Sequence, residues 1–225
     1  MTTLQTILAG VEIAIETFSL AMDDAAIEAL RRDITADEST KIARLISPQK
    51  QRRAIAARGQ LRRILGTRLN CAPLTVPLGI GTHGKPYIAE PSASLHFNLA
   101  HSGDAAVLAI CGDTEIGIDI EPLRDIDLNI GRAILSAQEQ LALDAIESSS
   151  RSARLLERWT MKEAVLKAVG CGFQRTPTSF DLGSFDSDHP VSIAAAPFDA
   201  HGTIIVTRLT DLWPGHAVSL AVHIA

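Results

Sequence analysis

Apolar and polar residues alternate with the period of a strand in some parts of the chain and with the period of a helix in others. Residues 11–18, VEIAIETF, alternate with a period of two, which predicts a strand, and a helical pattern follows over about 23–32. A second helix is predicted over 47–66, because a serine and a proline stand at its start and Gly66 can end it.

The remaining patterned segments are strands and one further helical region. Strand-like runs lie at 105–111, 115–121, 191–196, 203–209 and 216–225, and the helical region covers about 136–170. Residues 100–110 resemble residues 213–224, and each of these segments follows a helix that closes with a similar sequence, LRRILG or LKAVG. The order indicates an α+β protein in which one unit is used twice, although two independent α+β units would look much the same.

The composition is that of an ordinary globular protein. With 225 residues, 46% hydrophobic and 21% charged, the chain can bury one large core or two small ones. The formal net charge of −5 and the aromatic content of 4% argue against general nucleic-acid binding, which draws on basic surface and stacking side chains. We therefore expect no nucleic-acid partner.

Two features of the sequence favour the cytoplasm. Glu12 and Glu16 interrupt the first apolar stretch, which is unlike a signal peptide, and no later apolar run is long enough to span a membrane. Cys71, Cys111 and Cys171 are odd in number and widely spaced, which suits reduced thiols better than a disulfide framework or a zinc site.

The strand-like run EIGIDIE carries the first candidate chemistry. Its period of two places three isoleucines on one face and Glu115, Gly117, Asp119 and Glu121 on the other. Two carboxylates thus lie side by side, with a glycine expected to leave space beside them, and Mg²⁺ favours one or two carboxylates together with water and substrate phosphates. The alternative is simply the polar face of a half-buried strand.

The segment RWTMKEAVLKAVGCGF carries the second candidate chemistry. At helical spacing its apolar stripe comprises Met161, Ala164, Val165 and Ala168, while Trp159, Glu163 and Lys167 follow one another at i,i+4 steps on another side. A solvated Glu–Lys pair on a surface helix is the simpler interpretation. The large aromatic Trp159 on the same line instead indicates a helix that is covered on both sides.

The turn GIGTHGKP, residues 79–86, has the spacing of two phosphate-binding motifs but the wrong continuation. A dinucleotide-binding turn and a Walker A loop must both run into a helix, whereas Pro86 and the following residues lack helical periodicity. We expect Gly79 and Gly81 to be turn residues with positive φ.

Four segments together resemble a known family. In this order over residues 84–173, they are GKP, FNLAHS, GIDIE and WTMKEAVLKAVGCGF. Together they are similar to the 4′-phosphopantetheinyl transferases of the larger, surfactin-synthetase-activating type. The resemblance implies a pseudo-dimer of two similar α+β halves with the active site between them, for which we expect the divisions 1–116 and 117–225. One departure is Ala100, where the family usually has a serine.

The resemblance also implies roles for individual residues. The expected Mg²⁺ ligands are Asp119, Glu121 and Glu163, and the expected contacts to coenzyme A are Arg53, Gly84, Lys85, Pro86, His101 and Lys167. Arg53 would hold the 3′-phosphate, with Arg52, Arg62 and Arg63 as alternatives. The Gly84–Pro86 turn would lie against the adenosine end, with Lys85 supplying charge to a phosphate. The catalytic residues would be Glu163, Lys167 and His101.

The implied reaction transfers 4′-phosphopantetheine from coenzyme A to a serine of an apo acyl or peptidyl carrier protein and releases adenosine 3′,5′-bisphosphate. Glu163 would take the serine proton, directly or through a metal-bound water. Two other classes stay open from the residues alone. They are a Mg²⁺-dependent phosphohydrolase acting on coenzyme A or a nucleotide, and a non-enzymatic module that binds coenzyme A or a carrier. We expect a monomer.

Overall fold

The computed structural model describes residues 1–90, 94–112, 114–171, 175–185 and 189–225. Its first antiparallel sheet has the order β1-β2-β6-β5 and its second the order β7-β10-β9-β8. The strands of the first sheet are β1 Thr2–Leu8, β2 Val11–Ser19, β5 His96–Ser102 and β6 Ala105–Cys111. Those of the second are β7 Glu115–Pro122, β8 Val191–Ala194, β9 Thr203–Arg208 and β10 His216–Ile224. A small hairpin of β3 Leu78–Ile80 and β4 Pro86–Ile88 precedes β5.

Helices follow the first strand of each half. They are α1 Asp24–Arg31, α2 Ala36–Ala43 and α3 Pro48–Leu69 after β2, and α4 Gly131–Ile134, α5 Ala137–Asp144 and α6 Arg151–Val169 after β7. Short 3₁₀ turns occupy Pro73–Thr75, Leu128–Ile130, Ser148–Ser150, Pro177–Ser179 and Ala196–Phe198. Within the described ranges, no helix is both long and apolar enough to cross a membrane.

The two halves repeat one topology, which confirms the predicted duplication. In the first half, β2 pairs with β6 and β6 pairs with β5, all antiparallel. In the second, β7 pairs with β10 and β10 pairs with β9 in the same way. A long helix lies between β2 and the β5–β6 pair in the first half, α3, and between β7 and the β9–β10 pair in the second, α6. Each half adds its own edge strand, β1 beside β2 and β8 beside β9.

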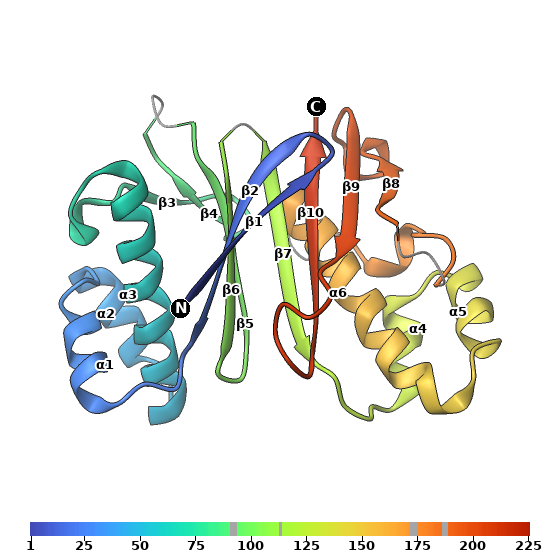
Figure 1. The fold of residues 1–225 in the computed structure, drawn as a ribbon, viewed down its shortest axis with the longest axis horizontal. Helices are drawn as coiled ribbons and strands as arrows, with labels where there is room; N and C mark the ends of the chain where they lie inside the picture. Colours follow the sequence, from blue (N-terminus) through green and yellow to red (C-terminus); the bar gives the residue numbers. More distant parts are fainter. Residues whose placement is uncertain (91–93, 113, 172–174, 186–188) are drawn as a thin grey trace.

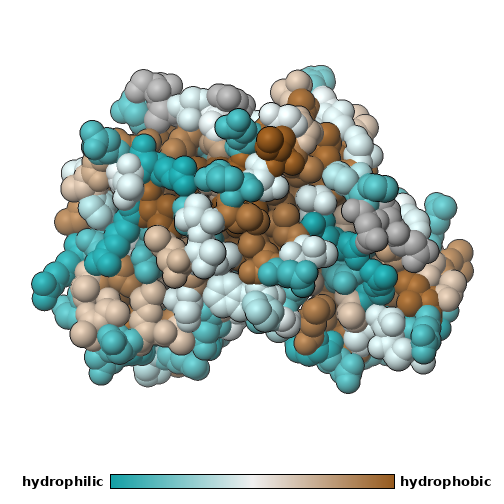
Figure 2. Space-filling view, in the orientation of Figure 1, coloured by the Kyte–Doolittle hydropathy of each residue, from teal (hydrophilic) through white to brown (hydrophobic). Residues whose placement is uncertain are grey.

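The molecule is built as helix, sheet, sheet and helix (Figure 1). The inner faces of the two sheets share one apolar cluster, which includes Ile13 and Ile15 of the first sheet and Ile118 and Leu220 of the second. A separate cluster joins α3 to the outer face of the first sheet, and another joins α6 to the outer face of the second. On the face shown in Figure 2, apolar side chains gather in the middle and polar ones lie mostly around them.

Some predicted details of the first half are wrong. Helix α3 does not end at Gly66 but continues to Leu69, and Asn70 in the left-handed conformation caps it. Gly66 is buried instead, where a Cβ atom would lie 2.8 Å from Cys71 O, so the glycine lets the returning chain pack on the helix. Gly79 is not a positive-φ turn residue either, because it lies in β3 under the ring of Tyr87.

The predicted division at residues 116 and 117 lies inside β7, whereas the chain changes sheet between β6 and β7. Whether the two halves form separate units stays a prediction.

The last residues of the motif that ends at 173 lie outside the described residues.

Candidate active site

Helix α6 packs directly on β7, and a glycine permits the close approach. A Cβ atom at Gly117 would lie 2.1 Å from Ala164 O and 2.4 Å from Ala168 N, both in the backbone of α6. A side chain of any other residue would therefore push the helix off the strand. The expectation of open space beside Gly117 is wrong, because the helix backbone occupies that space.

The carboxylate face of β7 is turned toward this helix, as the period of two predicts. The three isoleucines of the other face are at most 1% exposed in the central core. Lys167 Nζ of α6 lies 2.6 Å from Asp119 Oδ1 and 3.3 Å from Ile118 O. Asp119 is itself only 7% exposed, and burial raises its pKa although the charge of Lys167 opposes the shift.

Glu163 lies within electrostatic reach of both strand carboxylates. Burial raises the pKa of Glu163, the negative charge of Asp119 raises it further, and Glu121 adds a smaller contribution in the same direction. Lys167 only partly offsets these effects. Glu121 is anchored from the first half of the molecule, because Ser102 Oγ donates a hydrogen bond to its Oε2 at 3.1 Å. Three carboxylates from one strand and one helix thus repel one another across the contact between β7 and α6.

This carboxylate set suits a divalent cation in its chemistry. Asp119 Oδ2 is buried and has no hydrogen-bond partner among the described residues. Such an orphaned oxygen, near a second carboxylate whose pKa is also raised, Glu163, is what an oxygen-ligated cation would stabilise. In the described part of the chain, however, no group of three His, Cys, Asp or Glu side chains could hold a metal ion as the side chains stand. A cation at these carboxylates would therefore need some rearrangement of the side chains, with water or substrate oxygens among its ligands.

The first half contributes two basic side chains next to these groups. Partial removal of the His101 ring from water lowers its pKa, and the positive charges of Lys167 and Arg53 lower it further. His101 nevertheless keeps an exposed surface. Arg53 Nε donates to Asp104 Oδ1 at 2.7 Å, in the turn between β5 and β6. The structure thus brings Arg53, His101 and Lys167 together from α3, β5 and α6.

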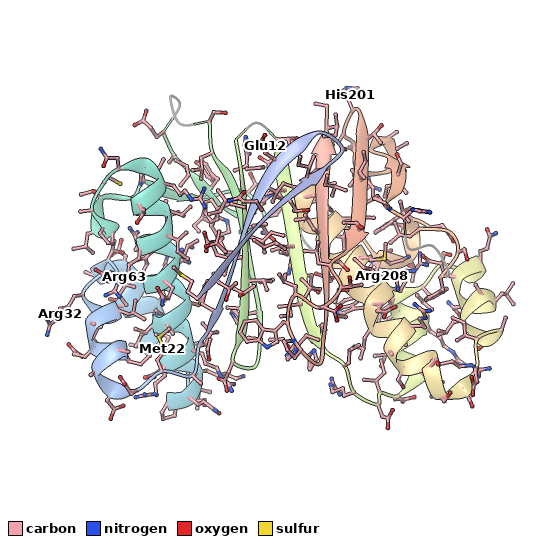
Figure 3. The ribbon with its side chains drawn as sticks, viewed as in Figure 1. Glu12, Met22, Arg32, Arg63, His201 and Arg208 are labelled. Carbon is pink, nitrogen blue, oxygen red and sulfur yellow. The ribbon has the colours of Figure 1, made fainter. Side chains whose placement is uncertain are left out.

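The three alternative arginines have other partners. Arg52 bonds to Asp24 and to Met22 O, and the nearly buried Arg62 bonds to Glu38 and to Pro73 O. Arg63 of α3, labelled in Figure 3, pairs with Asp33 at 2.5 Å. Of the four arginines, Arg53 is the one whose charge acts on His101.

The Gly84–Pro86 turn lies at a pocket of about 490 Å³ that is lined by both halves. Gly84 has φ +84°, and its amide donates to Gly81 O, which closes the turn. Tyr87 and Phe97 line the pocket from the first half, and Val169 lines it at the end of α6. The side chain of Lys85 reaches into the second half, where its Nζ lies 2.6 Å from Glu115 Oε2.

Sequence reasoning missed the side chains of β5 that bond to β7. His96 Nδ1 lies 3.2 Å from Glu115 Oε1, and Asn98 Oδ1 accepts the Ile118 amide at 2.9 Å. Ser102 forms the bond to Glu121 described above. These three residues lie on one face of β5 at a period of two, which is the signal that could have revealed them. Ala100 continues the same period and is buried in the central core.

A buried ion cluster anchors α6 on its far side. Lys162 Nζ lies 2.6 Å from Glu139 Oε2, and both side chains are 0% exposed. Arg158 NH1 lies 3.2 Å from Glu139 Oε1, and the same oxygen accepts the Leu182 amide at 3.0 Å. Lys162 also donates to Phe180 O at 2.7 Å. The helix that carries Glu163 and Lys167 is thereby fixed to α5 and to the segment that follows α6.

The fold and this site define a class of protein, and comparison with known sequences agrees. Residues 115–221 match the 4′-phosphopantetheinyl transferase superfamily, and residues 23–112 match the N-terminal region of a 4′-phosphopantetheinyl transferase. The two matches meet between β6 and β7, where the sheets change. The chain belongs to the 4′-phosphopantetheinyl transferase superfamily, a family of enzymes.

Individual relatives point the same way. The chain is 32% identical to the 4′-phosphopantetheinyl transferase HetI of Nostoc over 169 residues, which cover 73% of this chain and 71% of that protein. It is 32% identical to the 4′-phosphopantetheinyl transferase AcpT of Salmonella typhimurium over 152 residues, or 67% and 73% of the two chains. The putative 4′-phosphopantetheinyl transferase slr0495 of Synechocystis is 30% identical over 142 residues, and the match spans 58% of its length. These relatives favour a transferase over a phosphohydrolase or a non-enzymatic module.

Proposed function

We propose that this chain transfers the 4′-phosphopantetheine group of coenzyme A to a serine of an apo acyl or peptidyl carrier protein. The observation that carries the proposal is the convergence of Asp119, Glu121 and Glu163 with Lys167, His101 and Arg53 where the two halves meet. Acidic groups for a cation and basic groups for phosphates are both required by a pyrophosphate substrate.

The proposal assigns Asp119, Glu121 and Glu163 as the residues that would hold Mg²⁺. When bound, Mg²⁺ would neutralise negative charge on the pyrophosphate of coenzyme A. Their repulsion and the orphaned Asp119 Oδ2 support this assignment. Lys167 would turn from Asp119 to a phosphate oxygen, which its flexible side chain permits.

The other phosphate contacts come from the first half. Arg53 and His101 would bind the 3′-phosphate, since they lie beside Lys167 and Arg53 can exchange Asp104 for a stronger anionic partner. The adenosine end would occupy the pocket at Gly84 and Pro86, where Tyr87 and Phe97 offer aromatic surface.

In the proposed reaction, the carrier serine oxygen forms a bond to the β-phosphorus of coenzyme A while the bond to adenosine 3′,5′-bisphosphate breaks. The leaving nucleotide carries the electron pair, and Lys167 and His101 stabilise its growing charge. The serine proton passes to Glu163, directly or through a water. As a Mg²⁺ ligand Glu163 would lose basicity, which favours the route through water.

The test is incubation of the protein with coenzyme A, Mg²⁺ and a panel of apo carrier proteins, followed by intact mass measurement. The expected result is one phosphopantetheine added to at least one carrier, and no addition when the acceptor serine is replaced by alanine. Breakdown of coenzyme A without carrier modification would instead support the phosphohydrolase. Binding of coenzyme A with neither outcome would support the non-enzymatic module.

A monomer in the cytoplasm completes the proposal. Cys71, Cys111 and Cys171, all among the described residues, are not joined by disulfides, which suits a reducing compartment. The repeated halves place both sides of the site in one chain, so a second copy is not needed to complete it.

A further inference from the structure

Lys85 joins the Gly84–Pro86 turn of the first half to two elements of the second. Its Nζ lies 2.6 Å from Glu115 Oε2, 3.0 Å from Ile116 O and 3.4 Å from Ala168 O. The side chain is 18% exposed. An ammonium group has three N–H donors, so these three acceptors use all of them. The amine of Lys85 is thus committed to protein partners from β7 and α6.

Glu115 is held from a third direction. His96 Nδ1 of β5 lies 3.2 Å from Glu115 Oε1. The hydrogen bond from His96, with the charge of Lys85, lowers the pKa of Glu115 to about 2 although burial opposes the shift. Glu115 therefore keeps its negative charge throughout the pH range in which proteins of this kind are assayed, and its pairing with Lys85 persists there.

The contact with Ala168 O places Lys85 at the C-terminal end of α6. Carbonyl groups in the last turn of a helix lack partners within the helix, and a cation there is also favoured by the helix dipole. Lys167, the preceding residue, reaches Ile118 O on the same strand. Two lysines from different halves thus bond to carbonyls on either side of Gly117, where the helix and the strand are in closest contact.

We propose that Lys85 is a positioning residue. Paired with Glu115, it holds the last turn of α6 against β7 and so keeps Lys167 and Glu163 beside Asp119. The inference rests on the proposed function and replaces the expected phosphate contact of Lys85, because Lys85 acts through α6 rather than by contact with coenzyme A.

A thermodynamic cycle tests the pairing without any substrate. Lys85→Met, Glu115→Ala and the double variant are compared in urea unfolding, with the exposed lysine changed in Lys50→Met as the matched control. Each single variant should lower the urea midpoint, the double variant should lower it no further than the more affected single variant, and the control should match the wild type. Additive effects, or no effect of Glu115→Ala, would overturn the proposal.

Ligand binding and turnover distinguish positioning from phosphate contact. Two quantities are measured for each variant: the Kd of the probe adenosine 3′,5′-bisphosphate, and kcat at saturating coenzyme A and carrier. Both single variants should lower kcat by roughly 10- to 100-fold, as expected when the catalytic group is displaced by about 1 Å. Both should change the Kd in the same direction, and by less than about threefold.

Changes of the nucleotide Kd in opposite directions in the two single variants would refute the inference. If Lys85 bound a phosphate, Lys85→Met would weaken nucleotide binding, whereas Glu115→Ala would free the amine and strengthen it. A lower urea midpoint with unchanged kcat would also overturn positioning, because the pair would then be merely structural. If the wild type binds nucleotide but modifies no carrier, while the midpoints remain coupled, the result counts against the proposed function and leaves the pairing of Lys85 with Glu115 in place.

Discussion

Replacement of Gly117 by alanine is the sharpest test of how the strand and the helix form the site. The added Cβ would lie 2.1 Å from Ala164 O, while ordinary contacts begin at 3.4 Å, so the helix has to move away by roughly 1.3 Å. The atoms in the way belong to the helix backbone, which cannot rotate aside as a side chain can. Such overpacking costs about 1–3 kcal/mol or more of the free energy of unfolding.

The same displacement separates Glu163 and Lys167 from the carboxylates of β7. A misplacement of about 1 Å is worth around 10²-fold in rate, so Gly117→Ala should lose about that much transfer activity even at temperatures where it is folded. Gly112→Ala is the matched control, because the nearest atom to its Cβ would be Ser94 O at 3.9 Å. Urea unfolding and the carrier mass assay are run on both variants. Transfer by Gly117→Ala within about threefold of the control would refute the close-packing argument.

Three further predictions follow from charges at and near the site. Glu163→Gln should reduce transfer by roughly 10²–10⁴-fold. Yet the variant should have a higher thermal midpoint than the wild type at neutral pH in chelator, because the folded protein raises the pKa of Glu163 and its stability falls as the pH rises through that pKa. The gain should shrink toward acid pH, and a lower midpoint of the variant at neutral pH would contradict it. In a Mg²⁺ titration the wild type should gain more thermal stability than Asp119→Asn, and equal gains would remove Asp119 from the metal site. Glu139→Leu should cost about 3–5 kcal/mol in urea unfolding, because it leaves Lys162 and Arg158 buried without their shared carboxylate. Lys162→Met should lower the free energy of unfolding by less than Glu139→Leu does, because Glu139 still pairs with Arg158. A larger loss in Lys162→Met would show that the cluster is not held by its carboxylate.

Much of the fold could be predicted because most of its strands and helices are apolar or regularly patterned segments. The alternation of EIGIDIE separated the isoleucines from the carboxylates, and the structure confirms that the isoleucine face lies in the core. That the other face packs on α6 did not follow from the alternation. The duplication was visible from similar sequences in equivalent strands. Strand β1 was not predicted, because most of its residues are exposed and its sequence TTLQTIL shows no sustained alternation.

The site could be predicted only as far as local motifs reach. The candidate residues of β7 and α6 lie within short segments whose spacing fixes which side they face. The partners of Lys85 could not be found in this way, because Glu115, Ile116 and Ala168 lie in distant parts of the sequence and two of the three contacts are to backbone carbonyls. Glu139 and Lys162 likewise occupy ordinary polar positions on separate helices, and only packing reveals that both are buried.

The carboxylate site is an arrangement that opposes folding until a cation is bound. Asp119 Oδ2 is buried without a hydrogen-bond partner among the described residues, and burial raises the pKa values of both Asp119 and Glu163. For Glu163, the negative charges of Asp119 and Glu121 add to this effect. Both features make the charged, metal-free state less stable than a neutral one would be. The opposing energy has to come from contacts outside the site, and α6 provides them at three places. These are the backbone contact at Gly117, the ion cluster around Glu139 and the bonds of Lys85 at the end of the helix. A helix fixed in this way keeps Glu163 near Asp119 despite their repulsion.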